Sequence, residues 1–441
     1  MSHADMTTCS AGHSIEGGVA IRRGTTDHRT RISQERQMSR FVERAVSGLR
    51  RRARKLKRKL FGFEWLENVT RRPLVDSRPR ALLVYMVDPF LLPRSDISFL
   101  RHQNFQQSHN IVDVLDRMGY SVDVVDYLDE LRHLRGNYDL LISHRIRMEE
   151  CRAVLERAKL RVYLGAGMNH RIANANLVKR FHALSERRGF LDPTAFLVDE
   201  NFNCLRDFHA AFVFGNEYVQ ETWRQDLSCP VYGFDNYGFP WLQEIKRDYS
   251  SARHNFLFFG GYRQVLKGLD LLLEVFPAQK DLHLFVCGSY KREKDFCKLY
   301  AEELFSTPNI HPMDFIFVDS PAFQKISKQC AFVIHPACSE GQAGSVIQCM
   351  HAGLIPIVSR ETGIDVGEIG YILEDDSLET LREAILRASA MPIDALEQQC
   401  SRVVDIAKTK YSEEAFVRRW DEMLVDVHRR NNVSIPRENG M

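Results

Sequence analysis

Short apolar runs alternate with longer stretches of helical periodicity over most of this chain. A short apolar run between turn residues is typical of a buried strand, and apolar positions spaced three and four residues apart are typical of a helix. Their regular alternation predicts parallel sheets covered by helices on both faces, which is the α/β fold class. The strand-like runs lie at 81–87, 121–127, 138–144, 161–167, 210–216, near 255, 282–288, 331–335 and 355–359. The helix-like stretches lie at about 106–118, 291–304, 321–330, 378–388 and 413–428.

The 441 residues are enough for two domains of ordinary size and for tails. We expect an α/β domain over residues 76–250 and a second one over 251–405. Residues 406–441 carry a last helix and a tail. Residues 1–75 form a basic arm, and its first 38 residues are so rich in Ser, Thr, Gly, His and Arg that they are predicted to be disordered.

Residues 41–63 of the arm have apolar positions at helical spacing, with Arg and Lys on the other face. Between positions 40 and 59 there are ten basic residues and one acid. A basic amphipathic helix of this kind binds anionic membrane surfaces, and Phe61, Phe63 and Trp65 beside it favour that reading. A solvated arm, a nucleic-acid contact and an N-terminal targeting sequence are the alternatives.

The net charge of the whole chain is only +2, so the remainder is mildly acidic and nucleic-acid binding is not expected. No run of about eighteen apolar residues predicts a membrane span. The ten cysteines form no Cys-x-x-Cys pair and no metal-ligand spacing. We therefore expect reduced thiols in a cytoplasmic protein, with Cys287, Cys330 and Cys349 filling the core.

The stretch from 331 to 360 is the most informative. It predicts a buried strand, a Gly-rich turn with an acid, a helix that ends at Gly353, and a second strand. In an open α/β sheet such a turn lies at the carboxyl end of its strand, where ligands bind, and the N-terminus of the following helix favours an anion. Glycines at 341 and 344 would let a phosphate approach the backbone. The alternative is that these glycines only relieve steric crowding.

This stretch resembles the C-terminal signature of retaining glycosyltransferases with two Rossmann-like domains facing a cleft, the GT-B fold of glycosyltransferase family 4, or group 1. Glu340 and Gly341 match the first part of the signature, and Met350, Gly353 and Pro356 match the last. The signature has a second Glu where this chain has Gln348. Gln can hydrogen-bond a diol but brings no charge.

The resemblance implies roles for particular residues. Glu340 would contact the donor sugar, Gln348 the ribose, and Lys267 the diphosphate. The family has an Arg where this chain has Gly261, so Arg263 is the nearest substitute. Further donor contacts would come from Gly341 and, through backbone N–H groups, from Gly344 and Ser345; His144 would lie beside the donor sugar as a catalytic residue. A surface or capping role is the alternative for His144 and for His170.

The implied activity is transfer of a hexose from a nucleoside diphosphate sugar to a glycan or lipid-linked glycan, with retention and without a metal or other cofactor. Polysaccharide or lipopolysaccharide synthesis on the cytoplasmic face of a membrane is the implied setting. The family architecture also implies that the last helix crosses back onto the first domain. A sugar-nucleotide epimerase or phosphorylase on the same fold, and a pseudo-transferase that binds nucleotide sugar without turnover, remain as alternatives.

Overall fold

The computed structural model describes residues 65–72, 77–202, 204–239 and 245–436, all of which belong to one compact unit, Phe63–Met441. The amphipathic stretch predicted over 41–63 lies outside the described residues. Trp65, which the sequence grouped with that stretch, instead lies in strand β1 and pairs with Val125. The folded part therefore begins earlier than the first apolar run at 81.

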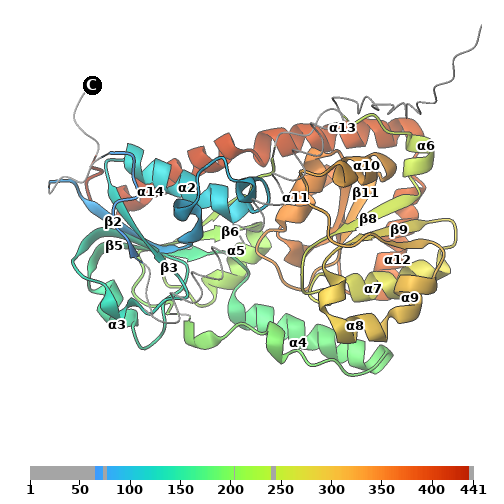
Figure 1. Cartoon of the computed structure of the whole chain (residues 1–441), viewed down its shortest axis with the longest axis horizontal. Helices are drawn as coiled ribbons and strands as arrows, with labels where there is room; N and C mark the ends of the chain where they lie inside the picture. The colour runs from blue at the N-terminus through green and yellow to red at the C-terminus, as the bar shows by residue number, and fades with distance from the viewer. Residues whose placement is uncertain (1–64, 73–76, 203, 240–244, 437–441) are drawn as a thin grey trace, which may run out of the picture. The chain divides into compact units, whose positions relative to one another are not determined.

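The first sheet has seven strands in the order β1-β3-β2-β4-β5-β6-β7. All neighbours are parallel except β1, which runs antiparallel to β3 along one edge. Figure 1 shows this sheet in the half of the view that holds β2, β3 and β5. The strands are β1 (Trp65–Leu66), β2 (Arg80–Tyr85), β3 (Ser121–Asp126), β4 (Tyr138–Ser143), β5 (Ala158–Gly165), β6 (Ala210–Phe214) and β7 (Val231–Phe234).

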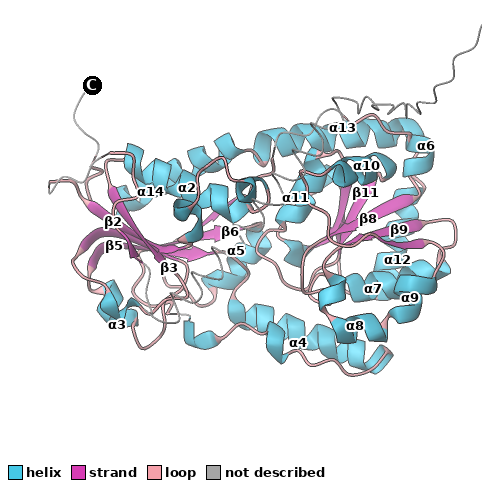
Figure 2. Cartoon of the chain, viewed as in Figure 1, coloured by secondary structure: helices cyan, strands magenta, loops and turns pink. Residues whose placement is uncertain are grey.

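The second sheet has six strands, all parallel, in the order β10-β9-β8-β11-β12-β13. Its central strands are almost wholly apolar because both faces are covered by helices, as Figure 2 shows. The predicted α/β class with two parallel sheets is thus confirmed. The strands are β8 (Asn255–Phe259), β9 (His283–Cys287), β10 (Ile310–Pro312), β11 (Phe332–His335), β12 (Ile355–Ser359) and β13 (Tyr371–Leu373).

Each stretch predicted to be helical is helical, with one difference, and two 18-residue helices, α4 and α13, were not predicted. The helix expected over 291–304 is two helices, α8 and α9, which meet at the fully buried Tyr300. The Tyr300 hydroxyl donates to Glu274 at 3.0 Å, and this anchor explains the break. The helices are α2 (Gln103–Arg117), α3 (Cys151–Leu155), α4 (His170–Arg187), α5 (Glu217–Arg224), α6 (Tyr249–Ala252), α7 (Leu269–Val275), α8 (Lys294–Leu299), α9 (Ala301–Ser306), α10 (Pro321–Gln329), α11 (Gly344–His351), α12 (Leu378–Ser389), α13 (Ile393–Lys410) and α14 (Glu413–Arg430).

Helix α4 follows a strand of the first sheet, yet its apolar side chains lie in the core of the second. Leu177, Phe181 and Leu184 belong to the cluster built around β8 and β11. In Figure 1 the helix runs beside α7 and α8. Arg180 of α4 is only 2% exposed, and its Nη1 lies 3.7 Å from Oδ1 of the fully buried Asp270 in α7. A buried ion pair therefore joins α4 to the second sheet.

Helix α14 lies on the first sheet, although it follows the second sheet in sequence. Phe416, Trp420 and Leu424 are buried in the same cluster as the strands β2 to β6. The ring of Trp420 meets Phe212 of β6 edge-on, with centroids 5.2 Å apart. The last helix thus returns to the first sheet.

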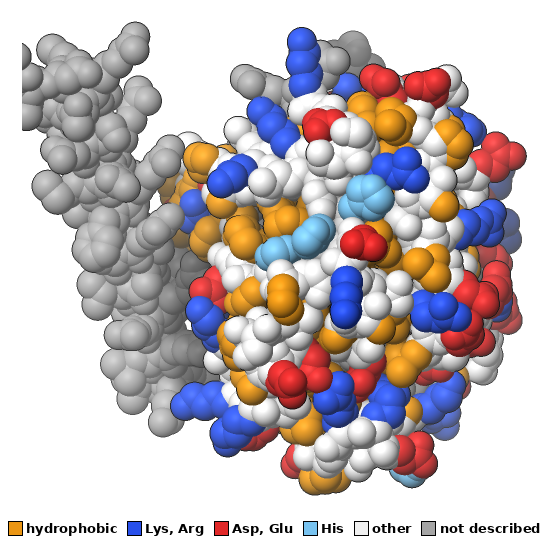
Figure 3. Space-filling model, turned by 90° about the vertical axis from the view of Figure 1, so that its right-hand side faces the viewer, with side chains coloured by type: hydrophobic (Ala, Val, Ile, Leu, Met, Phe, Trp, Pro, Cys, Tyr) orange, Lys and Arg blue, Asp and Glu red, His pale blue; other side chains and the backbone are white. Residues whose placement is uncertain are grey.

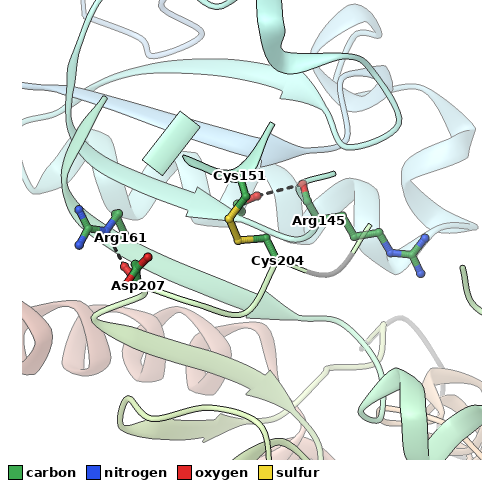
Figure 4. Close-up of a disulfide and its surroundings, with 6 residues drawn as sticks. Arg145, Cys151, Arg161, Cys204 and Asp207 are labelled. Atoms are coloured by element: carbon green, nitrogen blue, oxygen red, sulfur yellow. Dashed lines mark hydrogen bonds between the residues drawn. A yellow bond between two sulfur atoms is a disulfide. The ribbon is translucent and has the colours of Figure 1, made fainter. Parts of the chain in front are cut away.

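The cysteines differ from the sequence-based expectation at one pair. Cys151 and Cys204 are joined by a disulfide, which Figure 4 shows, so the prediction that every thiol is reduced is wrong for these two. Cys287, Cys330 and Cys349 are free and fully buried, as expected of core residues. The disulfide ties the segment after β4 to the segment before β6, where Met148 N–H also donates to Asn201 O.

No helix among the described residues is long and apolar enough to cross a membrane.

Figure 3 shows the face at the right-hand side of Figure 1, on which acidic and basic side chains are interspersed with apolar ones. A nucleic-acid interface needs a basic stripe, and this face has none.

Candidate functional site

Two cations come from the connection between β8 and α7. Arg263 has a left-handed backbone (φ 74°), and both its N–H and that of Gln264 donate to Glu293, which fixes the loop. Lys267 stands one residue before Gly268, the N-cap of α7. Its Nζ forms an ion pair with Oε1 of Glu340, and the side chains of both partners are largely buried. The second sheet thus brings Arg263, Lys267 and Glu340 to one place.

Glu340 lies in the signature turn, Ser339–Gly341, between β11 and α11. Its backbone N–H donates to Glu361 O at 3.0 Å. Burial opposes ionisation of the carboxyl group, but Lys267, helped by His335, holds its pKa at about 2. His335 lies 3.6 Å away, is fully buried and stacks on Phe258; burial lowers its pKa, so the ring is neutral at pH 7. Glu340 is therefore ionised at any physiological pH.

The signature turn touches the first sheet backbone to backbone. A Cβ added to Gly341 would lie 2.7 Å from Cα of Gly167 and 3.0 Å from the oxygen of Ala166. The carbonyl oxygen of Gly341 in turn leaves no room for a Cβ on Gly215 or Gly363. Packing therefore requires glycine at position 341. This is the steric role that the sequence left open as the alternative to binding a phosphate.

His144 directly follows β4 of the first sheet. Its N–H donates to Val84 O, and its Nδ1 lies 2.9 Å from Leu164 O, where it donates as the neutral tautomer. Burial lowers the pKa of His144 to about 4. A neutral His with Nδ1–H committed to the backbone leaves Nε2 as an acceptor.

These residues line one cavity between the two sheets, with a volume of ≈ 350 Å³. Among the described residues, Glu340 is the only acid in its lining. The first sheet contributes His144, Arg145, Tyr163, Met168, His170 and Trp223, among others. The second sheet contributes Tyr262, Arg263, Leu266, Lys267, Ser339, Glu340 and Gly341.

Four predicted donor contacts lie outside this lining. Both ends of the Gln348 amide bond the backbone of Phe239, at 2.9 Å from Phe239 N and 3.4 Å from its oxygen. Gln103 of α2 packs directly against Gly344, because a Cβ added at position 344 would lie 1.8 Å from Gln103 Oε1. Ser345 lies in the first turn of α11. Gly261 lies after β8, and its carbonyl oxygen accepts from Ser289 N–H. The signature helix is therefore covered by α2 and the chain near 239.

The cavity residues that were not singled out for this role from the sequence include Arg145, Tyr262 and Trp223. Arg145 follows β4 and Tyr262 follows β8, so their position after a strand was the available signal. Trp223 lies in α5, and its Nε1–H donates to Gly167 O at 2.8 Å. No sequence pattern marks that contact. Among the described residues, no group of three or more His, Cys, Asp or Glu side chains could hold a metal ion.

We expect His144 to give the folded protein an acid-sensitive stability. The unfolded ring titrates near its ordinary value of 6.5 and the folded one at about 4, so between these pH values the unfolded state binds more protons. Stability should thus fall as the pH drops from 6.5 towards 4. In a His144→Gln variant this part of the slope should vanish, as urea unfolding at several pH values would show. Identical slopes in the two proteins would contradict the assignment.

Residues 253–390 match the protein family described as glycosyl transferases group 1. The matched range contains Lys267, Glu340 and Gln348. The resemblance found in the signature is thereby confirmed over the second sheet. No curated protein sequence matches this chain.

Several solved structures are similar. Anabaena HepE in complex with UDP-glucose has a TM-score of 0.51 and 12% identity, covering 79% of this chain and 100% of HepE. WaaG, a glycosyltransferase involved in lipopolysaccharide biosynthesis, has a TM-score of 0.45 and 12% identity, covering 79% and 98%. S. aureus TarM has a TM-score of 0.43 and 13% identity, covering 65% of this chain. This chain spans only 54% of TarM. The likeness to HepE confirms the predicted GT-B fold.

Proposed function

We propose that this protein is a glycosyltransferase that moves a hexose from a nucleoside diphosphate sugar to a glycan or lipid-linked glycan, with retention and without a metal. The observation that carries the proposal is the convergence of Arg263, Lys267 and Glu340 in one cavity between two parallel sheets. This convergence lies within the range that matches the group 1 family.

The charges of the cavity suit such a donor. Charge grows on the diphosphate as the glycosidic bond breaks, and a guanidinium and an ammonium stabilise that charge in a partly buried site. Arg263 and Lys267 therefore bind the diphosphate in place of a metal ion. Glu340 accepts hydrogen bonds from the sugar hydroxyls, and neutral His144 offers Nε2 from the opposite wall.

HepE, which shares this fold, is known in complex with UDP-glucose, and a uridine diphosphate hexose is therefore the first donor to test. We expect one nucleoside diphosphate among UDP, GDP and ADP to raise the melting temperature of the full-length protein, because a ligand of the native state stabilises it by mass action. Lys267→Ala should abolish the shift. Since that change also unpairs Glu340, Arg263→Gln, whose guanidinium has no ion pair among the described residues, is the second variant and should weaken the shift. Absence of a shift with all three nucleotides would remove the basis for the donor site.

A pseudo-transferase is the second candidate, favoured by Gly261 in the place of the family Arg and by Gln348, whose amide is occupied by Phe239. Turnover of the nucleotide sugar distinguishes an active transferase from a pseudo-transferase. With the donor that binds, we expect slow hydrolysis of the nucleotide sugar to free nucleotide and sugar, unchanged by EDTA because cationic side chains replace the metal. Binding without hydrolysis or transfer would favour the pseudo-transferase, and inhibition by EDTA would contradict metal independence.

A further inference from the structure

The wall that the first sheet contributes to the cavity carries a cation that the donor site does not use. Arg145 directly follows His144 at the end of β4 and is half-buried. Its side chain extends away from the disulfide, as Figure 4 shows, and its guanidinium lies 6.0 Å from the centroid of the Tyr127 ring. No carboxylate of the described residues lies within ion-pair distance of it.

The same cavity is lined by His170, which has an unsatisfied buried polar atom. The residue is 6% exposed and lines the cavity, and its Nδ1 has no hydrogen-bond partner among the described residues. His170 is the first residue of α4, an 18-residue helix. Its N-cap Asn169 accepts the N–H of Arg171 and donates to Asp226, which also pairs with Arg171. The N-terminus of a helix carries partial positive charge and unpaired N–H groups, both of which favour an anion.

The rest of this wall has neither a carboxylate nor a side-chain amide among the described residues. Sugar hydroxyls donate as well as accept, and carboxylates and side-chain amides are the usual partners that accept from them. The described residues of the first sheet and its loops place no Asp, Glu, Asn or Gln side chain in the cavity lining. Besides His144, its polar groups include the Arg145 guanidinium, the His170 imidazole, the Tyr163 hydroxyl and the N-terminus of α4, so the charge that this wall presents is positive.

We propose that Arg145, His170 and the N-terminus of α4 bind an anionic group, a phosphate or a carboxylate, on the acceptor. The proposal rests on the proposed function, because it takes the wall opposite Arg263 and Lys267 as the acceptor side. It narrows the acceptor to a phosphorylated or acidic glycan. Charge-assisted hydrogen bonds at 145 and 170 give that preference.

The test is calorimetric titration of the full-length protein, saturated with the nucleoside diphosphate that binds, with glucose 6-phosphate, glucuronate and glucose. We expect one anionic sugar to bind at least about tenfold more tightly than glucose. The phosphate and carboxylate arms distinguish the two sources of charge. Arg145→Gln should remove the preference, Arg145→Lys should retain part of it, and Arg152→Gln, whose side chain is 90% exposed and lies outside the cavity lining, should leave it unchanged.

Three results would overturn the proposal: equal binding of glucose, a preference that survives Arg145→Gln, or displacement of the nucleotide by the anionic sugars, which would place Arg145 in the donor site. If no nucleotide binds, the donor function fails, but the same titration without nucleotide still decides the anion site. His170→Asn, checked by its melting temperature for folding, should weaken binding of the same anionic sugar, and unchanged binding would exclude His170 from the site.

Discussion

Replacing Glu340 by glutamine should lower kcat/KM for sugar transfer about 10²–10³-fold, as removal of one charged group from a reaction site does. Of the residues that the structure describes, Glu340 is the only acid that lines the cavity, and Lys267 keeps it ionised. Glutamine has almost the same volume, so the turn should persist and nucleotide binding, measured by thermal shift, should remain. The loss should therefore appear in transfer and not in folding.

The matched control is Glu368→Gln, since the side chain of Glu368 is 88% exposed and lies outside the cavity lining. This variant should transfer sugar at the wild-type rate. If Glu340→Gln retains activity within about twofold of wild type, the carboxylate has no part in the reaction and the role given to the signature turn is wrong.

Gly363→Ala should destabilise the fold by about 3 kcal/mol or more, or prevent folding. Gly363 has φ +77°, a backbone conformation that residues other than glycine rarely adopt. An added Cβ would also lie 1.8 Å from the carbonyl oxygen of Gly341, a backbone atom that cannot move alone. Equilibrium urea unfolding at neutral pH measures the loss.

Gly367→Ala separates the two causes. Gly367 also has a left-handed backbone, with φ +46°, but nothing lies within 4 Å of its added Cβ. Gly367→Ala should therefore lower the free energy of unfolding only by the conformational cost, about 1 kcal/mol. Equal losses for the two variants would mean that Gly341 does not pack against Gly363 in solution.

The strands of the second sheet could be predicted because strands buried on both faces are continuous apolar runs. Phe332–His335 and Ile355–Ser359 lie where those runs lie in the sequence. The group around Glu340 could also be predicted, since an acid in a Gly-rich turn after a buried strand has few other positions open to it. Both patterns can be recognised within a single segment of the sequence.

What could not be predicted depends on contacts between distant segments. Gln348 has the spacing of a ligand contact, but its amide bonds Phe239, which is 109 residues away. The apolar face of α4 fits either sheet, and only the packing of Leu177 and Phe181 shows that it joins the second. Arg145 and His170 line one cavity because β4 and β5 are neighbours, which no single segment reveals.

Helix α4 also determines how the chain can be divided. A fragment that ends before residue 250 would expose Leu177, Phe181 and Leu184 to water and leave Arg180 without Asp270. A fragment that begins there would have a hole in its core and an uncompensated buried carboxylate, which is a large penalty. The two sheets are therefore halves of one cooperative folding unit, and unfolding should show a single transition instead of two.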